Sequence, residues 1–164
     1  MEEEVVGLLK EKQLKISFAE SCTGGLLAAT LINVSGASAV IEESFITYSD
    51  KAKHKLLGVK KNTLKKHGAI SRKTAKEMAR GCAQITKSDI CVSVTGNAGP
   101  LADENKAVGL VYIGIFYDKK VNVYEFNLSG DRRQIREHIQ RKRKRQDMWT
   151  RAESQHSPSG HRIS

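Results

Sequence analysis

A glycine-marked turn near the start of the sequence carries residue types that suit nucleophilic chemistry. Residues 20–25 read ESCTGG and lie between a short apolar run and a stretch of small residues. Glycines let a backbone approach a ligand closely, and a helix that follows presents N–H groups to an anion. Ser21 can therefore be a nucleophile whose oxyanion is stabilised by those N–H groups. The alternative is a structural turn in which Ser21 or Thr23 caps the helix, since the turn matches neither the G-x-S-x-G elbow nor the P-loop.

A second segment, YSDKAK at residues 48–53, stands where a predicted strand meets a predicted helix. A lysine that is desolvated at such a junction has a lowered pKa and can act as a base. Tyr48 beside it can relay a proton or hold the site together. The alternative is an amphipathic strand residue followed by solvated helix lysines. The spacing does not choose among Lys51, Lys53 and Lys55.

Two later segments contain groups that suit a phosphate or a sugar. Residues 95–100, TGNAGP, follow an apolar strand and either wrap a phosphate or ribose or form a plain loop. Residues 130–133, GDRR, open the last predicted helix, where Asp131 can act as the cap and one arginine can clamp a phosphate. The alternative for both arginines is a surface role.

The cysteines and histidines show no spacing typical of a metal site. Cys22, Cys82 and Cys91 have no paired spacing, which excludes a disulfide framework and a CxxC metal knuckle. Cys82 and Cys91 fall on apolar faces and are predicted in the core. The five histidines are scattered. We therefore expect no structural zinc site. No cofactor is expected either.

These candidate residues must be positioned by helices and strands that the apolar periodicity predicts. Helices are expected at about 5–14, 26–32, 51–57, 62–67, 71–83 and from Asp131, and strands at 15–19, 40–48, 89–95, 108–117 and 121–128. Alternating strands and helices followed by a late hairpin predict an α/β fold, a three-layer sandwich with a mixed β-sheet flanked by helices in a single domain. Ligands of such sheets bind at the carboxyl ends of strands, and two of these ends, after Ala19 and Thr95, are marked by glycine.

The charge of the chain is concentrated near its end. The 164 residues carry a net charge of +10. Residues 1–131 contain 18 Lys and Arg against 15 Asp and Glu, a net of +3, whereas residues 132–164 contain 10 against 3, a net of +7. We therefore predict a folded domain at 1–140 and a basic, disordered tail at 141–164.

The sequence contains no feature of a membrane or secreted protein. No apolar run approaches the ~20 residues of a membrane span. The acidic N-terminus, MEEE, differs from the basic start of a secretory signal. We expect a cytoplasmic protein without a membrane partner.

Several motifs together resemble one known family. The chain contains AESCTGG at 19–25, GASA at 36–39, TYSDKAK at 47–53, LGV at 57–59, HGAIS at 67–71, EMA at 77–79, TGNAGP at 95–100 and GDR at 130–132. In this order they make residues 1–140 similar to the CinA C-terminal domain family, the nicotinamide-nucleotide amidohydrolases. The resemblance implies hydrolysis of nicotinamide mononucleotide to nicotinate mononucleotide and ammonia in pyridine nucleotide recycling.

The resemblance also implies roles for individual residues. It assigns a Ser–Lys–Tyr mechanism without metal to Ser21, Lys53 and Tyr48, with Lys53 as the base. Tyr48 would bridge the other two residues or steady the oxyanion, together with N–H groups of residues 22–25. The residues expected to contact the substrate are Thr23, Gly24, Gly25, Gly96 and Arg132.

Two segments depart from the family pattern and leave other functions open. Residues 101–105, LADEN, replace a glycine-rich stretch of many members, and after Ile139 an Ala- and Leu-rich helix pattern becomes Arg- and Lys-rich. The alternatives are a catalytically silent nucleotide-binding or regulatory module, or weak, unspecific nucleic-acid binding through residues 141–145. We also expect a homo-oligomer, since association commonly covers the edge of a small sheet.

Overall fold

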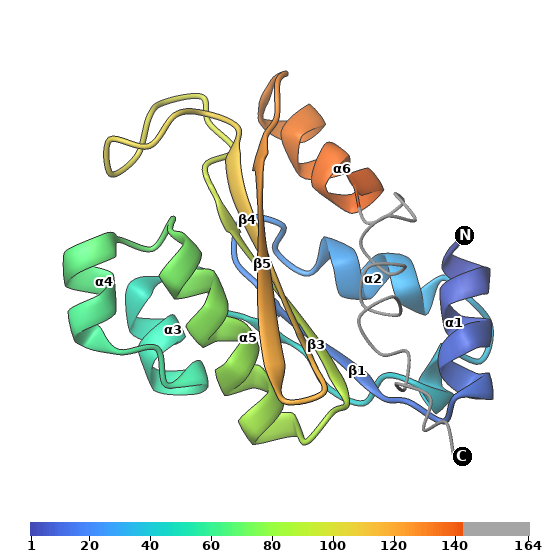
Figure 1. The fold of residues 1–164 in the computed structure, drawn as a ribbon. Coiled ribbons are helices and arrows are strands. Elements are labelled where there is room, and N and C mark those ends of the chain that lie inside the picture. The colour runs from blue at the N-terminus through green and yellow to red at the C-terminus, as the bar shows by residue number, and fades with distance from the viewer. Residues whose placement is uncertain (143–164) are drawn as a thin grey trace, which may run out of the picture.

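A mixed five-stranded sheet forms the centre of the molecule (Figure 1). The structure is a computed structural model, and it describes residues 1–142. The strands are β1 Ile16–Glu20, β2 Phe45–Ile46, β3 Ile90–Gly96, β4 Leu110–Tyr117 and β5 Lys120–Asn127. They lie in the order β2-β1-β3-β4-β5. β1 is parallel to β2 and β3, whereas β4 is antiparallel to both of its neighbours.

Helices cover both faces of this sheet, as Figure 1 shows. One face carries α3 (Asp50–Leu57), α4 (Lys61–His67) and α5 (Arg72–Thr86). The other face carries α1 (Glu2–Glu11), α2 (Leu26–Ile32) and α6 (Arg132–Lys142), and a 3-10 helix at Ala37–Ala39 follows α2. The predicted three-layer α/β sandwich with a mixed sheet is confirmed, and so is the late hairpin of β4 and β5.

Two apolar clusters lie on opposite faces of the sheet, because successive side chains of a strand point to opposite faces. In β1, Phe18 belongs to the cluster with α1, α2 and α6, whereas Ala19 belongs to the cluster with α5. Met78 and Cys82 on α5 pack with Cys91 of β3 in this second cluster. The prediction that Cys82 and Cys91 are core residues is therefore confirmed.

Hydrogen bonds from β3 side chains hold α5 and the segment before it against this strand. The Ser93 hydroxyl donates to the Ala75 carbonyl at 2.6 Å, and the Thr95 hydroxyl donates to the Ala69 carbonyl at 2.7 Å. Gly114 of β4 lies under the same helix, and a Cβ there would stand 2.8 Å from the Ala75 oxygen. The start of α5 is thereby held against the strand end at which the cavity described below opens.

The edge strand predicted at residues 40–48 is wrong for most of its length. Within residues 40–48, only β2 pairs with β1 as a strand, and Ile41 forms an isolated bridge to Ile16. Between them, the Ser44 hydroxyl accepts the Phe18 N–H at 3.1 Å. A side chain therefore takes the place of a main-chain carbonyl there, and the strand ladder is interrupted despite the β-rich composition.

Two predicted helix caps are confirmed. The Ser71 hydroxyl accepts the Thr74 N–H at the start of α5. At the start of α6, the Asp131 carboxylate accepts the Gln134 N–H at 2.8 Å, and the Gln134 side chain accepts the Asp131 N–H at 2.9 Å. This reciprocal pair of bonds satisfies two main-chain donors that a helix start leaves free.

The predicted basic tail falls almost entirely outside the structure. Helix α6 continues to Lys142, two residues beyond the predicted domain end, and residues 143–164 lie outside the described residues. Among residues 1–142, no helix is long and apolar enough to cross a membrane.

Candidate active site

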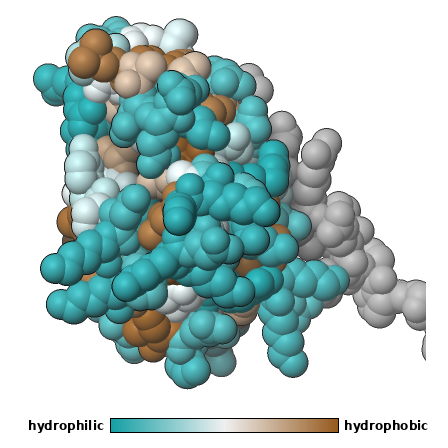
Figure 2. Space-filling view, turned by 90° about the vertical axis from the view of Figure 1, so that its left-hand side faces the viewer, coloured by the Kyte–Doolittle hydropathy of each residue, from teal (hydrophilic) through white to brown (hydrophobic). Residues whose placement is uncertain are grey.

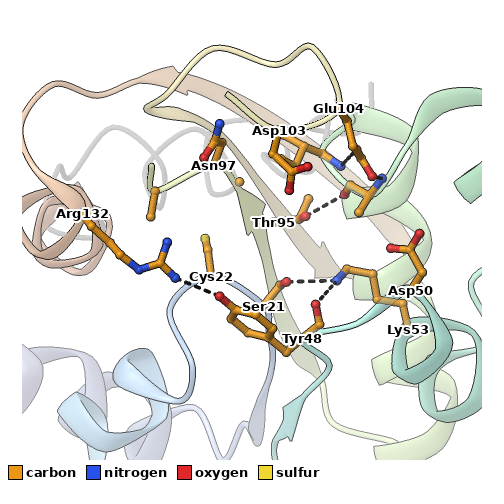
Figure 3. A pocket seen from close by; sticks show the side chains of 14 residues that line it. Ser21, Cys22, Tyr48, Asp50, Lys53, Thr95, Asn97, Asp103, Glu104 and Arg132 are labelled. Carbon is orange, nitrogen blue, oxygen red and sulfur yellow. Dashed lines mark hydrogen bonds between the residues drawn. The ribbon is translucent and has the colours of Figure 1, made fainter. Parts of the chain in front are cut away.

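A cavity of about 160 Å³ opens at the carboxyl ends of β1 and β3 (Figure 3). Its described lining comes from five parts of the sequence: the turn after β1, the start of α3, the segment before α5, the end of β3 with the loop that follows it, and the start of α6. The lining side chains include Ser21, Cys22, Tyr48, Asp50, Lys53, Thr95, Asn97, Asp103, Glu104 and Arg132. The structure therefore brings the two glycine-marked strand ends to one site.

Ser21 and Lys53 form a buried hydrogen-bonded pair in this cavity. The Lys53 ammonium nitrogen lies 3.0 Å from the Ser21 hydroxyl oxygen. Ser21 is 8% exposed and Lys53 is 1% exposed. Ser21 is held by its N–H, which donates to the Val94 carbonyl at 3.0 Å. Lys53 is held by the first turn of α3, where the Ser49 hydroxyl accepts the N–H of Ala52.

Burial changes the acid–base properties of Lys53. Besides Ser21, its nitrogen contacts the carbonyl oxygens of Thr47 at 2.8 Å and Tyr48 at 3.3 Å, which are uncharged acceptors. Burial lowers the pKa of Lys53, and the nearby Asp50 carboxylate partly opposes this decrease. A lysine with a lowered pKa is more readily neutral, so that it can accept a proton from Ser21.

The structure places only one of the three candidate lysines at this serine. Lys51 and Lys55 are exposed on α3, and Lys53 alone points into the cavity. Because 3.6 residues make one helical turn, residues two positions apart face nearly opposite directions. The fold therefore selects Lys53 where the spacing left the choice open.

Tyr48 and Arg132 form a second hydrogen-bonded pair, at the exposed side of the cavity. An Arg132 nitrogen donates to the Tyr48 hydroxyl at 2.8 Å, and another donates to the Gly99 carbonyl at 2.6 Å. Tyr48 is 60% exposed. Its main-chain carbonyl contacts Lys53, whereas its hydroxyl points to Arg132 (Figure 3). Of the bridge expected between Tyr48, Ser21 and Lys53, the structure shows the contact of the Tyr48 carbonyl with Lys53, whereas the Tyr48 hydroxyl binds Arg132.

Three of the predicted substrate contacts do not line the cavity, although Gly96 and Arg132 do. The three are Thr23, Gly24 and Gly25, which shape the turn instead. Gly24 and Gly25 have φ values of +59° and +100°, which favour glycine. The Thr23 carbonyl accepts a hydrogen bond from Arg136 at 3.1 Å.

The anion expected at the start of α2 is supplied by the protein itself. The buried Glu20 carboxylate accepts the N–H groups of Leu27 at 2.9 Å and Ala28 at 3.1 Å. These two N–H groups therefore already have a hydrogen-bond partner within the protein. The sequence signal for this contact was an acidic residue shortly before a helix. The sequence-based interpretation of the turn did not consider Glu20 as the partner of these N–H groups.

Sequence reasoning also missed the two acidic residues of the loop before β4. Asp103 and Glu104 line the cavity. The Glu104 carboxylate accepts the N–H groups of Ala69 at 3.2 Å and Ile70 at 3.3 Å. The segment LADEN was noted only as a departure from a family pattern, and no local signal indicates a contact across 35 residues.

Cys22 lies beside Ser21 but is poorly suited to act as the nucleophile. Burial raises the pKa of its thiol to about 11. The reactive thiolate is therefore scarce near neutral pH. Among residues 1–142, no group of three or more His, Cys, Asp or Glu side chains is arranged to hold a metal ion.

Comparison with known proteins then identifies the family. The family model described as CinA C-terminal domain matches residues 1–143. The chain belongs to the CinA C-terminal domain family. A CinA-like protein of Kosmotoga olearia is 52% identical over 137 residues, which are 83% of this chain and 33% of that protein. A Caldicellulosiruptor bescii protein described as competence-damage inducible is 56% identical over 138 residues, which are 84% of this chain and 34% of that protein.

Solved CinA structures share this fold. A CinA superfamily protein of Escherichia coli has a TM-score of 0.83 at 29% identity and covers 85% of this chain and 82% of its own. A competence/damage inducible protein of Agrobacterium tumefaciens has a TM-score of 0.82 at 37% identity and covers 86% and 87%. The present chain spans about a third of the length of the curated relatives described above.

Proposed function

We propose that this CinA-family chain hydrolyses the carboxamide of nicotinamide mononucleotide to nicotinate mononucleotide and ammonia. The observation that carries the proposal is the hydrogen bond of 3.0 Å between the Lys53 nitrogen and the Ser21 hydroxyl at the buried end of the cavity. A serine activated by an adjacent base is a nucleophile for acyl transfer. The sequence resemblance to the amidohydrolases supplies the substrate.

Ser21 and Lys53 account for both halves of the proposed reaction. Neutral Lys53 accepts the Ser21 proton as the hydroxyl oxygen attacks the amide carbon. Collapse of the tetrahedral intermediate breaks the C–N bond, and Lys53 gives the proton to the departing nitrogen, which leaves as ammonia. Water then attacks the Ser21 ester while Lys53 accepts its proton, and the second collapse releases the acid and restores the serine hydroxyl.

The turn after Ser21 supplies the donors that we assign to the oxyanion. The Gly24 N–H already donates to the Ser21 carbonyl at 3.0 Å. We therefore assign oxyanion stabilisation to the N–H groups of Cys22 and Thr23, which follow the nucleophile directly. Main-chain donors held in a rigid turn stabilise developing charge without reorganisation.

The charges around the cavity match the charges of the proposed substrate. Nicotinamide mononucleotide combines a cationic ring with an anionic phosphate. Figure 3 shows Arg132 on one side of the cavity and Asp103 and Glu104 on the other. We assign the phosphate to Arg132, which can form charge-assisted hydrogen bonds, and the ring to the side with the carboxylates. All three cysteines are unpaired, which supports placing the reaction in the reducing cytoplasm.

Ammonia release from nicotinamide mononucleotide by the full chain tests the proposal. We expect turnover by the unchanged protein and a loss of at least about 10³-fold in Ser21→Ala. The matched control is Cys22→Ala, which removes the neighbouring thiol and should keep activity within a few-fold. Absence of turnover in the unchanged protein, near-normal turnover in Ser21→Ala, or loss confined to Cys22→Ala would contradict the assignment.

A further inference from the structure

The near-neutral charge of residues 1–131 hides a strong separation of charge. Residues 50–80 contain 11 Lys and Arg against 2 Asp and Glu, a net of +9. The other residues of 1–131 contain 7 against 13, a net of −6. The positive charge of the folded part therefore belongs to one continuous segment.

This segment forms one face of the molecule. Residues 50–80 make up α3, α4 and the first part of α5, which cover the same side of the sheet (Figure 1). Figure 2 looks onto this side and shows it covered largely by hydrophilic side chains. Ten of its 11 basic residues are exposed, and Lys53 is the exception. Across the sheet, α1 begins with three glutamates.

Four of these lysines line a groove between α3 and α4. The groove has a volume of about 650 Å³ and is lined by Asp50, Lys51, His54, Lys55, Lys61, Leu64 and Lys65. Lys51 and Lys55 are four residues apart on α3, and Lys61 and Lys65 are four residues apart on α4. This spacing puts each pair on one side of its helix, about 6 Å apart along the axis. Four positive charges and one carboxylate, that of Asp50, therefore flank one groove.

Nothing in the described part of the chain neutralises these four charges by direct contact. Within residues 1–142, no ion pair joins any of the four lysines to a carboxylate. The Glu77 carboxylate of α5 is already hydrogen-bonded at the start of α4. It accepts the Lys60 N–H at 3.0 Å and the Thr63 hydroxyl at 2.8 Å. Like charges four residues apart destabilise a helix, so an external anion would stabilise both helices.

We propose that this lysine face, centred on the groove of Lys51, Lys55, Lys61 and Lys65, binds the phosphate backbone of double-stranded nucleic acid. Lysines contact phosphates as point charges and confer affinity without sequence preference. Single-strand binding needs aromatic platforms for the bases, and none of the described groove residues is Phe, Tyr or Trp. Among the groove residues that the structure describes, the buried Leu64 is the only apolar side chain, which is too little for a protein or membrane contact. The proposal is independent of the amide hydrolysis assigned above.

The test measures binding of a labelled DNA duplex of mixed sequence to the full chain by fluorescence anisotropy over a range of salt concentrations. The groove variant is Lys51→Gln, Lys55→Gln, Lys61→Gln and Lys65→Gln combined. The matched control carries Lys10→Gln, Lys12→Gln, Lys119→Gln and Lys120→Gln, which remove the same charge from exposed positions elsewhere. Both variants keep the basic residues 141–164, so the contribution of that segment is equal in the two.

We expect the groove variant to bind at least about tenfold more weakly, with a slope of log affinity against log salt shallower by about three to four. The duplex affinity of the control variant should stay within about threefold of that of the unchanged protein. Both variants should release ammonia at the unchanged rate and melt at a similar temperature, which shows that they are folded. The proposal would be overturned by an equal loss of duplex affinity in both variants. It would also be overturned if the unchanged protein bound the separated single strand more tightly than the duplex, or a poly-glutamate peptide as tightly as the duplex.

Discussion

Two hydrogen-bonded pairs line the same cavity and differ chiefly in their contact with water. Ser21 and Lys53 are 3.0 Å apart and buried. Tyr48 and Arg132 are 2.8 Å apart, and both side chains are exposed. The two bonds have nearly the same length, so distance alone does not separate their roles.

This difference indicates that burial determines whether a basic side chain at this site is suited to accept a proton or to bind an anion. Removal from water lowers the pKa of Lys53 and so favours the neutral form that the proposed mechanism requires of a proton acceptor. An arginine at the exposed side stays positively charged and is suited to hold an anion rather than to move a proton. We therefore expect substitutions in the buried pair to affect kcat, and substitutions in the exposed pair to affect KM.

The largest expected effect is that of Lys53→Met, which keeps an unbranched side chain one atom shorter and removes the base. We expect kcat for ammonia release to fall about 10³- to 10⁴-fold, because Ser21 then keeps its proton during attack. Steady-state kinetics with nicotinamide mononucleotide measure the effect. The neighbouring Lys55→Met is the control and should stay within a few-fold of the unchanged rate.

A double substitution tests whether the buried pair acts as one unit. Lys53→Met combined with Ser21→Ala should be no slower than the slower single variant, since residues of one catalytic unit are not additive. Multiplied losses, or substantial turnover in Lys53→Met, would show that Lys53 acts apart from Ser21.

The next effect concerns the exposed pair. Arg132→Gln should raise KM for nicotinamide mononucleotide about 10- to 100-fold and change kcat much less, because a charge-assisted bond to phosphate is lost. The same kinetics with nicotinamide riboside, which lacks the phosphate, should be nearly equal for the two proteins. A fall in kcat as large as that of Lys53→Met, at unchanged KM, would contradict the phosphate assignment.

A smaller effect is expected for Tyr48→Phe, which removes the hydroxyl and keeps the main-chain carbonyl that contacts Lys53. The loss of one exposed partner of Arg132 should raise KM less than about tenfold and leave kcat nearly unchanged. Steady-state kinetics of Tyr48→Phe, measured alongside those of Arg132→Gln, test this expectation. A fall in kcat above about 100-fold would instead place the Tyr48 hydroxyl on the reacting atoms.

The smallest expected effect is a shift of the pH profile. Lys53 must be neutral to accept a proton, so kcat/KM should rise with pH and level off below 10.5, the ordinary value from which burial lowers the Lys53 pKa. Asp50 raises that pKa, and Asp50→Asn should therefore move the rise to lower pH. Lys51→Gln, at an exposed neighbour, is the control. A shift to higher pH would contradict the proposed direction.

Much of the fold follows from local patterns that the sequence displays directly. The caps at Ser71 and Asp131, the end of α3 at Gly58 and the apolar face of α5 all depend on residues within a few positions of one another. The prediction of a strand at 40–48 failed because the Ser44 side chain accepts the Phe18 N–H and interrupts the ladder, a contact across 26 residues. Local composition contains no information on such a contact.

The sequence by itself determined the types of most elements, the serine and lysine segments that meet at the site, and the location of the positive charge. Only the tertiary structure decided which lysine reaches Ser21, that Glu20 occupies the start of α2, and that Arg132 meets Tyr48 across 84 residues. It also gathered four lysines of two helices around one groove. The physical reason is that local preferences act over one or two turns, whereas burial and distant contacts depend on how the sheet orders its strands.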